Sequence, residues 1–204
     1  MTQPVGIFDS GISGLSVLKA LRAELPHEDF IYIADSGHAP YGERDDAYVV
    51  ARSLAISKYL VKQNVKALVE ACNTATAAAI NQLRAAYPTV PIIGVEPALK
   101  PAVSISRTKH IAVMATRSTL VSARFASLQA AQGSEARFTL LPCDGLAEAI
   151  ERSCQSPNAT ELIAACARLI SAKGLFDTED KAKPGIDTVV LGCTYYPFAA
   201  QYFK

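Results

Sequence analysis

Short apolar segments alternate with longer amphipathic segments along the whole chain. The apolar segments are rich in β-branched and aromatic residues, which is typical of strands. This pattern predicts strands at Val5–Phe8, Phe30–Ala34, Ala67–Ala71, Ile92–Val95, Ile111–Ala115, Phe138–Leu141 and Thr188–Leu191.

Between these strands, apolar residues recur at helical spacing. Such spacing is found over residues 15–25, 48–60, 120–128 and 162–170. Ser118 and Thr160 stand where the third and fourth of these helices would be capped, and Gly133 and Gly174 stand where they would end. The third and fourth predicted helices therefore have a signal at each end.

Strands that alternate with helices predict an α/β fold, in which parallel sheets carry helices on both faces. Pro97, Pro101 and the polar run Ser104–Lys109 interrupt the pattern. We therefore predict two α/β domains, residues 1–98 and 99–204, that meet across a cleft. The charged segment Asp177–Gly185 is expected to be an exposed loop.

The composition narrows the class of protein. The chain has 204 residues, 20 basic and 19 acidic, and a formal net charge of +1, which gives no reason to expect a nucleic-acid partner. No apolar run approaches the roughly 18–20 residues that cross a bilayer, and the N-terminus has no signal-peptide pattern. We expect a cytoplasmic protein without a membrane segment.

The five cysteines and three histidines give no metal-binding pattern. The number of cysteines is odd, and no pair of them has C-x-x-C spacing. We expect neither a disulfide framework nor a metal site.

The first strand ends in a polar, glycine-rich turn. Asp9 and Ser10 precede Gly11 and Gly14, and the turn opens a helix whose N-terminal N–H groups would attract a carboxylate or phosphate. The alternative is that Asp9 and Ser10 are ordinary helix caps.

Two other turns resemble each other. Cys72 and Cys193 each follow a strand and a small residue, and each stands where a helix is expected to begin. A helix N-terminus lowers the pKa of a thiol from its reference value of about 8.5. A single strand-end cysteine is usually a small core residue, but the repeated pattern favours chemistry for this pair.

Two opposed thiols suit the inversion of a carbon that bears an acidic hydrogen. One thiolate would remove the proton, and the other thiol would return a proton to the opposite face. The transient carbanion would be stabilised by donors around a substrate carboxylate. This scheme requires no cofactor.

Other polar positions carry weaker signals. Thr116 and Thr119 follow a strand and could bind polar substrate groups, or they could serve only as caps. Pro40-Tyr41-Gly42 predicts a rigid turn. Cys143, Cys154 and Cys166 are assigned to packing.

These motifs together resemble the glutamate racemases of the cofactor-independent aspartate/glutamate racemase family. The resemblance is carried, in chain order, by Gly6–Val17, Pro40–Gly42, Ala71–Ala75 and Leu191–Thr194. It implies two α/β domains of similar topology with the active site in the cleft between them. It also implies glutamate as the small-molecule substrate, D-glutamate supply for peptidoglycan and the cell wall, and a homodimer.

The resemblance also implies roles for single residues. Cys72 and Cys193 take the positions of the two catalytic thiols, and Asp9 and Glu151 those of carboxylates that support them. Substrate-binding positions fall on Asp9, Ser10, Tyr41, Gly42, Asn73, Thr74, Thr116, Thr119, Thr194 and Tyr195.

Three departures from the family pattern matter. Tyr195 stands where the family usually has histidine, so we expect slower proton transfer at Cys193 than at Cys72. Ser13 replaces a common glycine. The family continues beyond the position of Lys204 through helices that return to the first domain, so we expect this chain to lack that cover.

Two alternatives to a glutamate racemase stay open at this point. One is a related racemase that acts on aspartate or another amino acid. The other is a silent protein that binds an amino acid or a partner protein without turnover, which Tyr195 and the short tail motivate.

Overall fold

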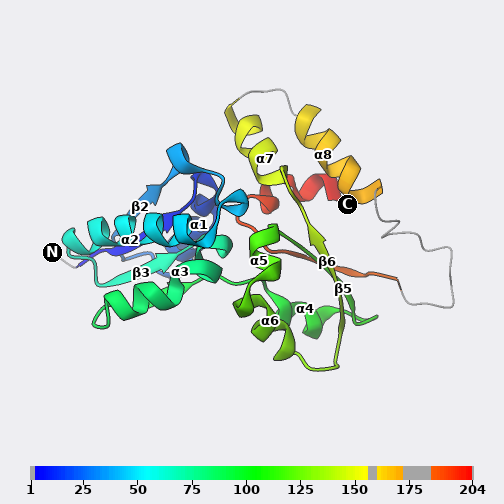
Figure 1. Cartoon of the computed structure of the whole chain (residues 1–204), viewed down its shortest axis with the longest axis horizontal. Helices are drawn as coiled ribbons and strands as arrows, with labels where there is room; N and C mark the ends of the chain where they lie inside the picture. The colour runs from blue at the N-terminus through cyan, green and yellow to red at the C-terminus, as the bar shows by residue number, and fades with distance from the viewer. Residues whose placement is uncertain (1–2, 156–159, 172–184, 204) are drawn as a thin grey trace. The chain divides into compact units, whose positions relative to one another are not determined.

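The structure is a computed structural model that describes residues 3–155, 160–171 and 185–203. The chain divides into two compact units, Met1–Glu96 and Pro97–Lys204. Each unit contains one sheet, and all the strand pairs in both sheets are parallel (Figure 1).

The first unit contains a four-stranded sheet in the order β2-β1-β3-β4. Its strands are β1 Val5–Asp9, β2 Phe30–Ala34, β3 Ala67–Glu70 and β4 Ile92–Gly94. Its helices are α1 Leu15–Glu24, α2 Asp46–Lys62 and α3 Asn73–Ala86, with short 3-10 turns η1 Ile12–Gly14, η2 Ser36–His38 and η3 Tyr41–Glu43.

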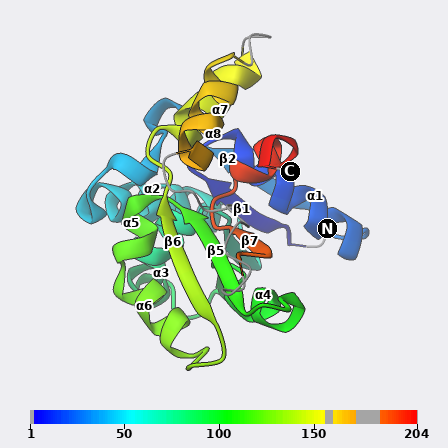
Figure 2. The ribbon, with the colours of Figure 1, turned by 90° about the vertical axis from the view of Figure 1, so that its right-hand side faces the viewer.

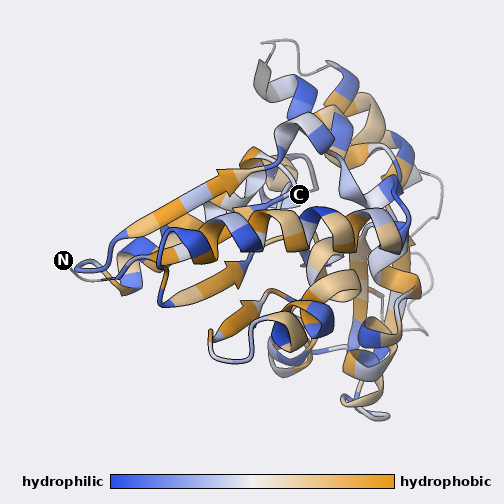
Figure 3. Cartoon of the chain, turned by 60° about the vertical axis from the view of Figure 1, so that its left-hand side comes forward, coloured by the Kyte–Doolittle hydropathy of each residue, from blue (hydrophilic) through white to orange (hydrophobic). Residues whose placement is uncertain are grey.

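Alternate residues of the central strands enter two separate cores. Phe8 and Leu68 pack with residues of α2 and α3 on one face of the sheet. Ile7 and Val69 pack with residues of α1 on the other face. Because both faces are covered, these strands are apolar except for Asp9 and Glu70 at their carboxyl ends. Figure 3 shows strands of this sheet mainly in orange.

The second unit contains a three-stranded sheet in the order β6-β5-β7. Its strands are β5 His110–Ala115, β6 Arg137–Pro142 and β7 Thr188–Leu191. Its helices are α4 Leu99–Ile105, α5 Arg117–Val121, α6 Ala123–Ala130, α7 Leu146–Gln155 and α8 Thr160–Ser171, followed by the 3-10 helix η4 Tyr196–Phe203.

The second sheet is also covered on both faces. Ile111 and Val113 of β5 pack with residues of α4 and α6. Ala112 and Met114 of the same strand pack with residues of α7, α8 and η4. Figure 2 shows β6, β5 and β7 side by side, with α5 and α6 along one side of them.

All seven predicted strands are present, and each boundary agrees to within one residue. The predicted α/β fold class with parallel sheets is therefore confirmed. α6 ends at Ala130 with Ala131 as its C-cap, and Gly133, predicted at the helix end, lies three residues after α6 with a φ of +59°.

The prediction for the third helix was wrong in its cap and its continuity. Ser122 has an extended backbone and divides the segment into α5 and α6. Its side chain accepts a hydrogen bond from the Phe125 N–H and caps α6, while Thr116 caps α5. Ser118 is not the cap, because it lies inside the first turn of α5.

The predicted interruption near Pro101 is instead occupied by α4. Proline is tolerated in the first turn of a helix, where the missing N–H has no intrahelical partner, and Pro101 is the third residue of α4. Thr160 is the first residue of α8, and the residue before it lies outside the described residues, as do Gly174 and most of the segment Asp177–Gly185.

Candidate active site

The carboxyl ends of the strands in the first unit bring several predicted site residues together. The Asp35 N–H donates to the Asp9 carbonyl at 3.0 Å, and the Ala71 N–H donates to the Phe8 carbonyl at 2.9 Å. The Cys72 sulfur lies 3.8 Å from the hydroxyl oxygen of Ser10, although the two residues are 62 positions apart in the chain. Asp9, Ser10 and Cys72 therefore share one edge of the sheet.

Asp9 is fully buried and holds the first turn together. Its Oδ2 accepts hydrogen bonds from the Ser13 hydroxyl at 2.8 Å and from the Gly11 and Gly14 N–H groups, both at 3.1 Å. A Cβ on Gly14 would stand 2.5 Å from the Asp9 Cβ, so glycine is required there. Asp9 therefore holds the turn that leads into η1 and α1, but it is not an ordinary helix cap, because the N-cap residues of these helices are Gly11 and Gly14.

The expectation of a lowered thiol pKa was wrong for Cys72. Burial, together with the negative charge of Asp9, raises the pKa of Cys72 to about 12. Hydrogen bonds from the Ala75 N–H and with Ser10 act in the opposite direction but are outweighed. The Cys72 thiol is therefore protonated at neutral pH.

The residues after Cys72 begin α3 and are buried. Asn73 is 6% exposed and Thr74 is 4% exposed. The Asn73 side-chain amide donates to the Val95 carbonyl at 3.2 Å, which ties the start of α3 to the residue after β4. Cys72 is the N-cap residue of α3, as the sequence predicted.

The predicted turn Pro40-Tyr41-Gly42 lies next to Cys72. Tyr41 is 2% exposed and forms one buried cluster with Val49, Cys72 and Ala75, and Gly42 is half-buried. The Tyr41 hydroxyl donates to Asp35 Oδ2 at 2.5 Å. The turn is thus packed against the thiol and is also held by a carboxylate.

Sequence reasoning missed three charged residues near this edge. Asp35 binds Tyr41 and forms an ion pair with Arg52, and Glu70 is fully buried in β3, two residues before Cys72. The sequence could have indicated Asp35, because its carboxylate directly follows a predicted strand. It could have indicated Glu70, because an acid inside an apolar strand is unusual.

In the second unit, the predicted hydroxyl pair lies at the end of β5. The Thr116 hydroxyl donates to the Thr119 hydroxyl at 2.9 Å, and Thr116 also accepts a hydrogen bond from the Thr119 N–H at 3.3 Å. Both side chains are buried. Thr116 therefore acts as a helix cap, and this contact also fixes the position of Thr119.

Cys193 lies at the end of β7 and is 8% exposed. The Gly192 N–H donates to the Met114 carbonyl at 2.7 Å, and a Cβ on Gly192 would stand 3.0 Å from that oxygen. This close approach explains the small residue before the cysteine. The helix after Cys193 is the 3-10 helix η4, not an α-helix as after Cys72.

The residues that follow Cys193 are also buried. Thr194 is 6% exposed and Tyr195 is 2% exposed, and Tyr195 belongs to the same core cluster as Cys193. Sequence reasoning missed Tyr196, which is fully buried and whose hydroxyl donates to the Cys143 carbonyl at 3.4 Å. Burial and the two neighbouring thiols, Cys193 and Cys143, raise the pKa of Tyr196 well above its ordinary value.

Glu151 lies on α7 and is half-buried. Its Oε2 is buried and accepts no hydrogen bond from the residues that the structure describes. Because no hydrogen bond in those ranges joins Oε2 to Cys193 or Thr116, the role of Glu151 stays a prediction.

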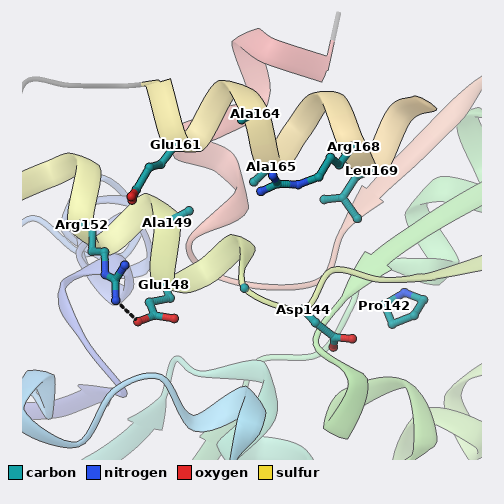
Figure 4. A pocket seen from close by; sticks show the side chains of 11 residues that line it. Pro142, Asp144, Glu148, Ala149, Arg152, Glu161, Ala164, Ala165, Arg168 and Leu169 are labelled. Carbon is teal, nitrogen blue, oxygen red and sulfur yellow. Dashed lines mark hydrogen bonds and ion pairs between the residues drawn. The ribbon is translucent and has the colours of Figure 1, made fainter. Parts of the chain in front are cut away.

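A cavity of about 630 Å³ lies between α7 and α8 (Figure 4). Glu148, Arg152, Glu161 and Arg168 are among its lining residues, and Arg152 donates to Glu148 at 2.6 Å across one helical turn. The lining contains no thiol and none of the predicted site residues. We therefore place the candidate active site at the strand ends and not in this cavity.

Within the described ranges, no group of three or more histidine, cysteine or acidic side chains could hold a metal ion. No helix in those ranges is long and apolar enough to cross a membrane.

The fold and these side chains define an α/β protein with two parallel sheets, each of which carries a cysteine at the carboxyl end of one strand. Residues 13–201 match the sequence pattern of the family described as Asp/Glu/Hydantoin racemase. The chain belongs to this family, as the resemblance of its motifs predicted.

Similar curated proteins are named glutamate racemases. The chain is 47% identical over 196 residues to the protein of Ectopseudomonas mendocina, with 96% of this chain and 70% of that protein covered. It is 48% identical over 196 residues to the protein of Ralstonia pickettii, with 96% and 65% covered. The chain thus spans about two thirds of the length of these relatives.

Solved structures with the same fold are also glutamate racemases. The Escherichia coli enzyme in complex with L-glutamate and the activator UDP-MurNAc-Ala is 30% identical, has a TM-score of 0.86, and is matched over 99% of this chain and 73% of that chain. The Francisella tularensis enzyme in complex with D-glutamate is 29% identical, has a TM-score of 0.78, and is matched over 98% and 71%.

Proposed function

We propose that this chain interconverts L- and D-glutamate, with Cys72 and Cys193 as the two acid–base groups. The observation that carries the proposal is the equivalent position of the two thiols. β2-β1-β3 and β6-β5-β7 have the same order of strands, and each cysteine follows the last strand of its set. Relatives named glutamate racemases support the choice of substrate.

The proposed reaction is a balanced exchange of protons. One cysteine, as a thiolate, takes the α-proton of glutamate and leaves a carbanion stabilised by its carboxylate and by surrounding donors. The thiol of the other cysteine then donates its proton to the opposite face of the same carbon. After one turnover the protonation states of the two sulfurs are exchanged, and no cofactor takes part.

The other predicted residues would bind and orient the substrate. In the first unit these are Asp9, Ser10, Tyr41, Gly42, Asn73 and Thr74, and in the second they are Thr116, Thr119, Thr194 and Tyr195. Asp9 and Glu151 would support the thiols. Buried hydroxyl and amide groups suit this task because they are already held in place before the substrate binds.

The high pKa of Cys72 defines what the bound substrate must supply. The ammonium group of an amino acid is a cation, and a cation close to a thiol favours the thiolate. Substrate binding would therefore offset part of the effect of Asp9 and burial. We also propose that the product serves peptidoglycan synthesis in the cytoplasm, which is the role that the family resemblance implies.

The proposal is tested by proton NMR of glutamate in D₂O during the early part of the reaction. With two distinct acid–base groups, the enantiomer that forms carries deuterium at the α-carbon, whereas the remaining starting enantiomer keeps its protium. A product that retains the original proton would contradict the two-base reaction.

Parallel samples of L-aspartate distinguish a glutamate racemase from a related racemase that acts on aspartate. Binding of glutamate without any α-proton exchange would identify a protein that binds the amino acid without turnover.

A homodimer, which the resemblance also implies, stays a prediction. Sedimentation velocity over a range of protein concentrations would test it, and a single monomer species throughout would contradict it.

A further inference from the structure

A buried carboxylate in the first unit has both oxygens engaged close to Tyr41. Asp35 follows β2 and is 8% exposed. Its Oδ1 accepts from the Arg52 guanidinium at 2.8 Å and lies 3.1 Å from His38 Nδ1. Its Oδ2 accepts from Arg52 Nε at 2.9 Å and from the Tyr41 hydroxyl at 2.5 Å.

The contact between Asp35 and Arg52 is bidentate, so it fixes an orientation as well as a distance. Two parallel N–H···O bonds hold the plane of the carboxylate in line with the guanidinium. Arg52 lies on α2, whereas Asp35 lies at the end of β2. The pair therefore ties a helix to the carboxyl edge of the sheet at the place where Asp9 and Cys72 lie.

The net electrostatic balance keeps this carboxylate charged. Burial acts to raise the pKa of Asp35, but hydrogen bonds from Arg52 and Tyr41 outweigh it, and the pKa lies below its ordinary value. Burial and the Asp35 carboxylate raise the pKa of Tyr41 above its ordinary value. Tyr41 is consequently a neutral hydrogen-bond donor to a charged acceptor.

Tyr41 also belongs to the buried cluster that contains the Cys72 thiol. Tyr41, Val49, Cys72 and Ala75 form one buried cluster, and Cys72 is 5% exposed. The hydroxyl of Tyr41 is thus anchored on Asp35, and its ring packs in the cluster to which Cys72 belongs. A second link runs through the backbone, because the Asp35 N–H donates to the Asp9 carbonyl.

We infer that Asp35 and Arg52 are positioning residues that hold Tyr41 and the turn Pro40–Gly42 against Cys72. Their catalytic consequence rests on the proposed function, in which Tyr41 and Gly42 bind the substrate. Their structural consequence, the cover over the Cys72 thiol, can be measured without turnover.

The test compares Asp35→Ala, Asp35→Asn, Tyr41→Phe and the double variant Asp35→Ala/Tyr41→Phe. Loss of a hydrogen bond to a charged group changes a binding or rate constant by about tenfold or more. We expect Asp35→Ala to raise KM for glutamate about tenfold, with a smaller change in kcat, because the turn that binds the substrate is loosened. The double variant should be no worse than Asp35→Ala alone, because both changes remove the same hydrogen bond.

The second readout is the rate at which iodoacetamide alkylates Cys72, resolved by peptide mass spectrometry. We expect about a tenfold faster alkylation of Cys72 in Asp35→Ala than in the wild type, and a smaller increase in Asp35→Asn, which keeps an acceptor for Tyr41. The rate at Cys166 in the same samples should not change. Arg52→Lys keeps the positive charge but cannot form the bidentate contact with Asp35, so it should also raise the alkylation rate at Cys72. This variant keeps the inference testable if Asp35→Ala fails to fold.

Asp187→Asn is the matched control. Asp187 accepts hydrogen bonds from the Ser106 hydroxyl and from the Arg107 and Thr108 N–H groups, so the change removes a hydrogen-bonded carboxylate that belongs to the second unit and does not contact Tyr41. Unchanged KM and unchanged Cys72 alkylation in the Asp35 and Arg52 variants would overturn the inference, as would effects in the double variant that multiply. A wild-type protein without α-proton exchange would instead contradict the proposed function, and the alkylation result would still stand.

Discussion

At the scale of single residues, Cys72 combines a nucleophilic atom with surroundings that keep its proton in place. Its sulfur is buried, and burial together with the negative charge of Asp9 raises the pKa of Cys72 to about 12, so the thiol keeps its proton at neutral pH. Under the proposed function, the ammonium group of the substrate would favour loss of this proton, so the thiolate would form next to the substrate.

Substitution of Asp9 by asparagine tests this account of the pKa. In Asp9→Asn, the amide oxygen could still accept the three hydrogen bonds that Oδ2 accepts in the wild type, but the negative charge would be gone. We expect the pKa of Cys72 to fall, so alkylation of the ligand-free protein reaches its plateau at a lower pH than in the wild type. The reference is the same peptide in urea-unfolded protein, where an ordinary thiol titrates near about 8.5. If Cys72 of the folded wild type titrated like that reference, the raised pKa would be contradicted.

Tyr195 leads to a second prediction at this scale. A phenol with a reference pKa near about 10 is neutral at pH 7 and cannot supply the cation that histidine can. Because a racemisation has an equilibrium constant of one, kcat/KM is the same for both enantiomers. A difference between proton transfer at Cys72 and at Cys193 therefore appears as a difference between the two values of kcat. We expect Tyr195→His to raise kcat in one direction by about tenfold and to shift its pH profile. Equal effects in both directions, or none, would remove the idea.

Residue-level contacts were the least predictable part of the site. The cysteines, Asp9 and the Pro-Tyr-Gly turn stand out in the sequence because they follow strands or include unusual residue types. The anchoring of Tyr41 by Asp35 and Arg52 does not, because Arg52 is one of several charged residues on α2 and nothing local indicates which of them turns toward the sheet.

At the scale of elements, close backbone approach decides where glycine is needed. Gly14 joins η1 to α1, and a Cβ there would lie 2.5 Å from the Asp9 Cβ and 2.7 Å from the Tyr32 hydroxyl. The turn can therefore keep its hydrogen bonds to Asp9 only without a side chain at this position.

We expect Gly14→Ala to lower the free energy of unfolding by about 1–3 kcal/mol, which is the usual cost of overpacking a closed site. Gly37→Ala is the matched control, because a Cβ at Gly37 meets nothing within 4 Å. Urea unfolding of both variants measures the difference. Equal stability of the two variants would show that the turn can move away from the added methyl group.

Elements differ in how well the sequence predicts them. The strands were predictable because strands buried on both faces are short, apolar and flanked by polar turns, as β1 and β5 are. The break between α5 and α6 was not, because apolar spacing continues through it and the side-chain cap at Ser122 decides it. α4 was missed because Pro101 indicates a break in general but not in a first turn.

At the scale of the whole molecule, the central feature is a repeated order of strands. β1, β2 and β3 in one unit correspond to β5, β6 and β7 in the other, and the repetition assigns Cys72 and Cys193 to equivalent ends. The alternation of strands and helices predicted parallel sheets, but it did not predict the order of the strands within each sheet. That order depends on long-range packing of both faces. In each sheet the third strand pairs with the first strand, on the side opposite to the second strand.

The measurement that tests this account most directly is α-proton exchange and racemisation of L- and D-glutamate by Cys72→Ser and Cys193→Ser, with Cys166→Ser as the control. Cys166 is 2% exposed and belongs to the same core cluster as Cys193, so the control makes the same chemical change in a buried thiol. We expect each of the first two variants to lose racemisation by a factor of about 10² or more, while Cys166→Ser stays near the wild-type rate. Racemisation at the wild-type rate by either Cys72→Ser or Cys193→Ser would contradict it.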